Sequence, residues 1–155
     1  MISKAREQAD RLLTEFGSMI GLDGFALDET GHARLAFDEV FVSLDLREED
    51  GSLVLVAPLG EPPERTVENY GRLLDANLHW AGTGGSTLAR EPATGVIVLQ
   101  HAIALDGLDE SSFETAVRGF VDAAERLAAL VATPPGSGRA NTPSPAESDF
   151  TVIQA

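Results

Sequence analysis

The chain has 155 residues, of which 43% are hydrophobic, so it can build one compact domain with a sizeable core and lacks the composition of a disordered protein. Its formal net charge of -14 disfavours binding to nucleic acid or to anionic membrane surfaces and favours a basic or amphipathic client, although excess carboxylates also serve solubility alone. The absence of cysteine excludes disulfides and thiolate metal sites, and the polar start and the lack of a long apolar run predict a soluble cytoplasmic protein.

The N-terminal part of the chain is expected to form a helix over residues 2–20. Apolar residues recur there at three- and four-residue spacing with charged residues between them, which is typical of an amphipathic helix. Gly17 and Gly21 mark the end of this helix.

Antiparallel strands are predicted between residues 25 and 59, because short apolar runs alternate there with turn signals. The runs are residues 25–27, 33–37, 40–46 and 53–59. In the third run Val42 and Phe41 lie on opposite faces, so one face of that strand is available to a partner.

Two further helices flank a predicted hairpin. Helical spacing resumes over residues 67–80, with Gly71 in the middle, where a cost of up to about 1 kcal/mol relative to alanine suggests close backbone packing. Strands at 87–90 and 96–105 are joined by a turn. Asp109 is expected to be the N-cap of the third helix.

These elements predict an α+β fold in which three helices pack on a twisted antiparallel sheet, in the order helix, strand meander, helix, hairpin, helix. Residues 1–132 are expected to form this one domain. Residues 133–155 are rich in Pro, Gly and Ser and are predicted to be a disordered tail. Its apolar end, residues 150–153, is either a docking strand or a mobile chain end.

No catalytic, cofactor-binding or metal-binding constellation is predicted. Residues 82–86 read Gly-Thr-Gly-Gly-Ser, but no Lys-Ser/Thr pair follows, so a flexible connector is favoured. The alternative is a small acidic enzyme or nucleotide-binding domain that uses the 82–85 loop. His32, His79 and His101 lack zinc-motif spacing; His32 is expected to be solvated and His101 to face out of its strand.

Several motifs in series resemble the class I type III secretion chaperone family, the Tir chaperone (CesT) type. They are Leu-Asp-Gly-Phe-Ala-Leu-Asp at 22–28, Val-Leu-Val-Ala-Pro-Leu-Gly at 54–60, Leu-Leu-Asp-Ala-Asn-Leu at 73–78, Gly-Thr-Gly-Gly-Ser-Thr-Leu at 82–88 and Phe-Val-Asp-Ala-Ala-Glu at 120–125. The resemblance covers roughly residues 8–130, and its specificity lies in the order of the series. The tail departs from the pattern.

The resemblance implies a cytoplasmic bacterial homodimer that binds the N-terminal region of one or a few secreted effectors and keeps it export-competent, without a cofactor or ATP hydrolysis. It leaves open whether the tail recruits the secretion ATPase.

The second helix is the expected dimer surface, because its apolar circumference exceeds one core-facing stripe; the alternative is that these residues fill the monomer's core. The dimer residues are expected to be Tyr70, Leu73, Leu74, Asn77, Leu78 and Trp80.

The first helix and the first strands are the expected effector-binding region, where an extended client would add to an exposed sheet edge. Its apolar pockets are expected to use Leu13, Phe16, Leu27, Leu35, Phe37, Phe41 and Val42, although some of these must belong to the core.

Overall fold

The computed structural model describes residues 1–136, so most of the predicted tail, from residue 137 on, lies outside the described residues. The elements in chain order are α1 (Lys4–Met19), β1 (His32–Phe37), β2 (Val40–Arg47), β3 (Ser52–Gly60), α2 (Val67–Asn77), a short 3-10 turn η1 (Leu78–Trp80), β4 (Thr87–Arg90), β5 (Ile97–Ala104) and α3 (Glu110–Ala132). Among the described residues, no helix is both long enough and apolar enough to cross a membrane.

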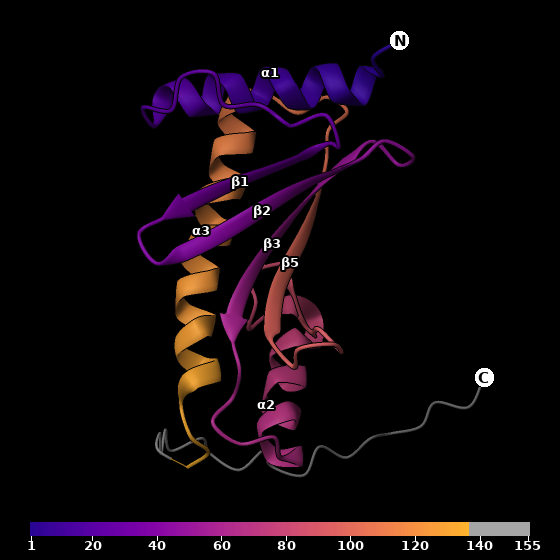
Figure 1. Ribbon diagram of the computed structural model, residues 1–155. Coiled ribbons are helices and arrows are strands. Elements are labelled where there is room, and N and C mark those ends of the chain that lie inside the picture. Colours follow the sequence, from indigo (N-terminus) through magenta and orange to yellow (C-terminus); the bar gives the residue numbers. More distant parts are fainter. Residues whose placement is uncertain (137–155) are drawn as a thin grey trace, which may run out of the picture.

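One five-stranded sheet organises the domain. Its strand order is β1-β2-β3-β5-β4, and every neighbouring pair is antiparallel. Figure 1 shows α1 lying across one end of the sheet, α3 running along the sheet, and α2 at the opposite end. The predicted fold class, three helices with an antiparallel sheet, is confirmed.

The core lies between the sheet and the helices α1 and α3. Alternate residues of β2 and β3, such as Val42 and Leu55, face this side and are buried. Phe16 of α1 meets Phe113 of α3 with ring centroids 5.7 Å apart and nearly perpendicular planes, a favourable edge-to-face contact. The two helices and the sheet therefore share one hydrophobic core.

Side chains at the helix starts satisfy amides that the helices themselves leave free. Ser3 accepts a hydrogen bond from the amide of Arg6, and Thr66 does the same for Asn69. Asp109 accepts from the amide of Ser112 at 2.8 Å, which confirms its predicted role as the N-cap of α3.

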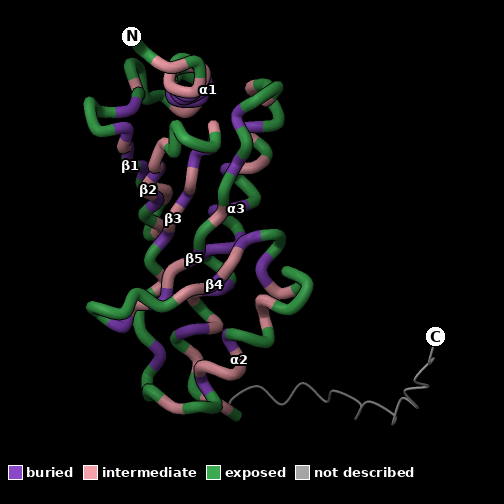
Figure 2. Tube along the Cα trace, turned by 90° about the vertical axis from the view of Figure 1, so that its right-hand side faces the viewer, coloured by how far each residue is buried: buried purple, intermediate pink, exposed green. Residues whose placement is uncertain are grey.

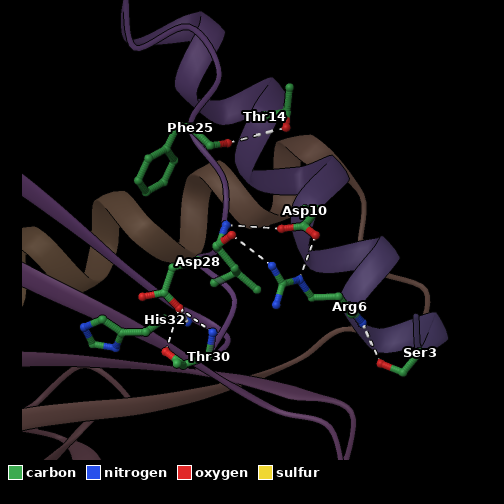
Figure 3. Close-up of polar contacts among 9 residues, drawn as sticks. Ser3, Arg6, Asp10, Thr14, Phe25, Asp28, Thr30 and His32 are labelled. Atoms are coloured by element: carbon green, nitrogen blue, oxygen red, sulfur yellow. Dashed lines mark hydrogen bonds and ion pairs between the residues drawn. The ribbon is translucent and has the colours of Figure 1, made fainter. Parts of the chain in front are cut away.

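The connection between α1 and β1 differs from the prediction, because residues 25–27 are not a strand. Instead, side chains of α1 bind the backbone of Leu27: its amide donates to Asp10 at 3.2 Å, and its carbonyl accepts from Arg6 at 2.9 Å. Figure 3 shows this clamp, in which Arg6 also donates to Asp10 at 2.8 Å. The backbone groups that a strand would pair are thus used by a helix.

Gly17 allows the same connection to approach α1 closely. A Cβ at this position would lie 2.5 Å from the carbonyl oxygen of Leu22 and 2.6 Å from the Cβ of Phe25. The end of α1 therefore depends on the absence of a side chain at Gly17, which the sequence predicted only as a helix-ending glycine.

Candidate protein-interaction surfaces

Helix α2 leaves a row of large apolar side chains open to solvent. Val67, Leu74 and Leu78 follow one another at helical spacing and are 90%, 67% and 66% exposed, and Trp80 just beyond is 57% exposed. Figure 2 shows that α2 has far less buried surface than α3. We call Val67, Leu74 and Leu78 the α2 apolar face, which Trp80 borders.

The six residues predicted for the dimer surface divide into three groups. Leu73 is buried in the core, and Asn77 is committed inside the chain: its side chain donates to the carbonyl of Leu88 at 3.0 Å and accepts from the Leu88 amide at 2.8 Å. Tyr70 is half-buried beside a hollow of about 220 Å³ between α2 and β4. Leu74, Leu78 and Trp80 are the exposed ones.

Gly71 is also open: nothing lies within 4 Å of a Cβ built there. The close packing predicted for this glycine is therefore not made within the described residues of one chain.

The turn after α2 holds Trp80 in an unusual backbone conformation. His79 and Trp80 have φ angles of 53° and 54°, in the left-handed region that residues other than glycine seldom adopt. The carbonyl of Trp80 accepts from the amides of Thr83 at 3.3 Å and Gly85 at 3.4 Å. These bonds fix the backbone of the turn, from which the Trp80 side chain is 57% exposed.

The glycine-rich loop of residues 82–86 is an organised turn and not a flexible connector. Its amides at Gly82, Thr83, Gly85 and Ser86 all donate to backbone carbonyls of the chain. The Thr83 side chain is fully buried and donates to the carbonyl of Ser86. A phosphate cradle needs free amides that converge on a ligand, so this loop does not support the nucleotide-binding alternative. Within residues 1–136, no group of three or more His, Asp or Glu side chains is arranged to hold a metal ion.

Of the seven residues predicted to bind an effector, five belong to the core of the chain. Leu13, Phe16, Leu27, Leu35 and Val42 are each less than 10% exposed. Phe37 is half-buried and packs on Phe16, with ring centroids 6.3 Å apart. Phe41 is 63% exposed, on the face of the sheet turned away from α1 and α3.

Two further apolar side chains near the end of α1 are exposed, Met19 at 52% and Leu22 at 46%, and neither was among the predicted binding residues. The sequence does carry a signal for them, since both lie within two residues of Gly21, where the helical pattern breaks.

Strand β1 stands at one end of the sheet, and no strand among residues 1–136 pairs with its outer edge. The amide of Leu46 donates to the carbonyl of Gly31, and paired and unpaired residues alternate along an antiparallel ladder. The backbone groups of Arg34 and Ala36 therefore point away from β2. Both residues are exposed.

A polar network crosses from β1 to β2 beside this edge. His32 lies directly opposite Asp45 and hydrogen-bonds to it, and Arg34 donates to the other ring nitrogen of His32 at 3.1 Å. The prediction that His32 is solvated is wrong, because the strand register brings it a carboxylate partner. His101 likewise does not face out: it lies opposite the buried Leu55 and hydrogen-bonds to the Gly85 carbonyl.

The carboxylate of Asp28 stabilises the turn that leads into β1. It accepts hydrogen bonds from the hydroxyl of Thr30 and the amide of His32, and these bonds hold the pKa of Asp28 below its ordinary value. The start of the edge strand is thus fixed by an ionised side chain.

Comparison with known proteins gives one consistent result. The profile of the Tir chaperone protein (CesT) family matches residues 11–128. The transcriptional anti-antiactivator ExsC of Pseudomonas aeruginosa is 33% identical over 119 residues, which cover 76% of this chain and 81% of that protein.

Solved structures agree with the family match. The ExsC-ExsE complex matches with a TM-score of 0.73 and 31% identity over 85% of this chain and 98% of that one. The HopA1-SchA chaperone-effector complex matches with a TM-score of 0.65 and 15% identity, over 81% of this chain and 97% of that one. The Yersinia pestis type III secretion chaperone SycH, bound to a fragment of YscM2, matches with a TM-score of 0.61 and 22% identity, over 77% of this chain and 98% of that one. The last two likenesses concern the fold alone.

Proposed function

Because this chain belongs to the Tir chaperone protein (CesT) family, we infer that it is a chaperone of type III secretion that binds effector proteins. The observation that carries this function is the family match over residues 11–128, which spans every helix and strand from the second turn of α1 nearly to the end of α3. The family is one of chaperones, and the proposal includes no catalysis. The proposed site of action is the bacterial cytoplasm, where a client would be held before export.

The proposed working form is a homodimer that pairs the α2 apolar face with its copy. A chain that leaves Val67, Leu74 and Leu78 in water loses the free energy of burying them, roughly 1.5–3 kcal/mol for each fully buried side chain. Gly71 lies within the same exposed helix and would let a second backbone come close. Tyr70 and Trp80 border this surface, while Leu73 and Asn77 support it from inside.

The proposed client site is the β1 end of the sheet. An extended effector segment would bind the free backbone groups of Arg34 and Ala36 and place side chains against Phe41 and Phe37. Leu13, Phe16, Leu27, Leu35 and Val42 then form the rigid floor beneath these contacts, since they are already packed.

A regulatory role is a second candidate, and one observation favours it. The relative that is 33% identical is named a transcriptional anti-antiactivator. We propose that binding and release of a client by this chain can also control transcription, because a chaperone occupied by one partner is unavailable to another.

Co-expression of the chain with the N-terminal regions of secreted proteins encoded beside it tests the proposed function. We expect one such fragment to co-purify with the chain and to become resistant to proteolysis, in a complex whose mass contains two chains. The Leu74→Glu variant should give complexes with one chain. A strictly monomeric wild-type chain that protects no fragment would refute the chaperone assignment.

A further inference from the structure

The sheet has a second stretch of open edge, in the middle of the molecule. Strand β4 pairs only with Ile97–Gln100 of β5, whereas β5 continues to Ala104. Within residues 1–136, no strand lies beside residues 101–104 on the side that β4 occupies further down.

The register shows which backbone groups face this gap. The amide of Leu105 donates to the carbonyl of Gly51, so the alternating ladder directs the backbone of Ile103 toward β3. Ala102 and Ala104, one residue out of phase, present their amides and carbonyls to the open side. Both alanines are exposed.

The same alternation is independently visible on β4. It predicts that the backbone of Leu88 points away from β5, and there the amide and carbonyl of Leu88 are bound by Asn77. On β4, Asn77 thus binds the outward backbone groups of Leu88, whereas beyond the end of β4 no strand among residues 1–136 covers the edge of β5.

A hollow lies on each face of the sheet at this gap. One, of about 410 Å³, is between the edge and α3 and is lined by His101, Ala116 and Gly119. The other, of about 310 Å³, is on the opposite face and is lined by Val54, Trp80 and Ala102. Successive side chains of a β-strand point to opposite faces, so one added strand would fill both hollows.

The gap is maintained by the loop that precedes β4. Gly84 and Gly85 have φ angles of 63° and 92° and turn the chain away from the edge. Arg126 of α3 donates to the carbonyl of Gly82 at 2.8 Å, and His101 binds the carbonyl of Gly85 at 3.0 Å. The loop is therefore anchored to α3 and to β5 at the border of the gap and does not fill it.

We propose that the edge at residues 101–104 binds an extended segment of the protein client as an additional strand, in line with β4. The client backbone would bond to Ala102 and Ala104, with a small side chain toward Gly119 and a larger apolar one against Trp80 and Val54. This assignment rests on the proposed chaperone function and adds to it a second docking site, remote from β1. A second copy of the chain fits less well, because a four-residue edge supplies little of the roughly 1,000 Å² that a specific interface buries.

The test uses the full chain and the effector fragment that co-purifies with it. Ala102→Pro removes the outward amide without touching the ladder to β3, and we expect it to weaken fragment binding at least tenfold. Ala102→Val keeps that amide and should bind within twofold of wild type. Amide hydrogen exchange, followed by nuclear magnetic resonance on the wild-type chain, tests the same site even if the proline variant does not fold. The amides of Ala102 and Ala104 should become protected from exchange when the fragment binds, while that of Ile103, already bonded to β3, should not change.

The outcomes separate the two proposals. Unchanged binding by Ala102→Pro, with loss of binding by Ala36→Pro on β1, overturns the second site and leaves the chaperone function standing. If Ala102→Pro changes the oligomeric state of the chain but not its affinity for the fragment, the edge binds a second copy of the chain, and the second client site is also overturned. A wild-type chain that binds no fragment refutes the chaperone function itself.

Discussion

Helices α2 and α3 have similar sequence patterns and opposite environments. Both are amphipathic, with apolar residues at three- and four-residue spacing. Eight residues of α3 are buried in the core, whereas α2 buries only Asn69 and Leu73. Helical periodicity therefore predicts which side chains form the apolar stripe of a helix. It does not predict whether the rest of the same chain buries that stripe.

The position of each helix relative to the sheet explains the difference. Helix α3 packs against β2, β3 and β5. Helix α2 packs mainly against β4, which has only four residues and ends one side of the sheet. A strand of that length covers one stripe of a helix, so the described residues leave the α2 apolar face uncovered.

The largest expected effect is on α3. Phe113 is fully buried and contacts Phe16, so Phe113→Ala should reduce the free energy of unfolding by about 3–5 kcal/mol through the lost contacts and the cavity. Urea unfolding at two protein concentrations measures it. The loss should be the same at both, and a concentration-dependent loss would mean that α3 also depends on a second chain.

A smaller loss is expected for Asn77→Ala on the inner side of α2. This change leaves the buried amide and carbonyl of Leu88 without their partner, which should cost about 1–3 kcal/mol. The exposed neighbour Asp75 provides the control, because Asp75→Ala should stay within about 0.5 kcal/mol. Equal effects of both variants would contradict the role of Asn77 as the cover of the β4 edge.

On the outer side of α2, Leu74→Glu should alter monomer stability by less than about 0.5 kcal/mol, since Leu74 touches solvent. It should nevertheless abolish dimers, because a carboxylate would be buried at the interface. Sedimentation equilibrium measures the loss of dimers, and urea unfolding measures the stability of the monomer. A Leu74→Glu chain that remains dimeric would show that the twofold contact lies elsewhere.

The smallest expected effect is a loss of stability at low pH in the first turn of α3. Hydrogen bonds from Ser112 hold the pKa of Asp109, the N-cap of α3, below its ordinary value, so ionisation of Asp109 favours the folded state. This stabilisation is present above the ordinary pKa of about 3.9 and is lost as the pH falls through the lower folded-state pKa. Thr66, the N-cap of α2, has no such titration.

Amide exchange at low pH should therefore increase in the first turn of α3 and not in that of α2. Asp109→Asn keeps a capping oxygen and should remove the difference between the two helices. An acid response of equal size in both first turns would contradict this assignment.

The sequence predicted the elements well because each carries its own periodicity or capping signal. The β1-β2 and β2-β3 pairs, the β4-β5 hairpin and the Asp109 cap all depend on residues close in sequence, whereas β3 and β5 pair across α2 and β4. The effector and dimer residues depend on tertiary contacts instead. Leu73 and Leu74 are neighbours in one helix, yet one is 4% and the other 67% exposed, because they point about 100° apart.

The role of Asn77 could not be read from its own helix, since its partner Leu88 lies across a loop and in another element. Residues 25–27 were misassigned for a related reason. Their apolar run matches a strand, but Arg6 and Asp10 of the preceding helix bind the Leu27 backbone.

Gly17 limits how this chain can vary. Helix α1 and the connection to β1 meet at this glycine, where even one methyl group would press on backbone atoms of Leu22 and displace the connection. Geometry alone therefore restricts the position to glycine. In a saturation mutagenesis screen Gly17 should therefore be as intolerant as the core.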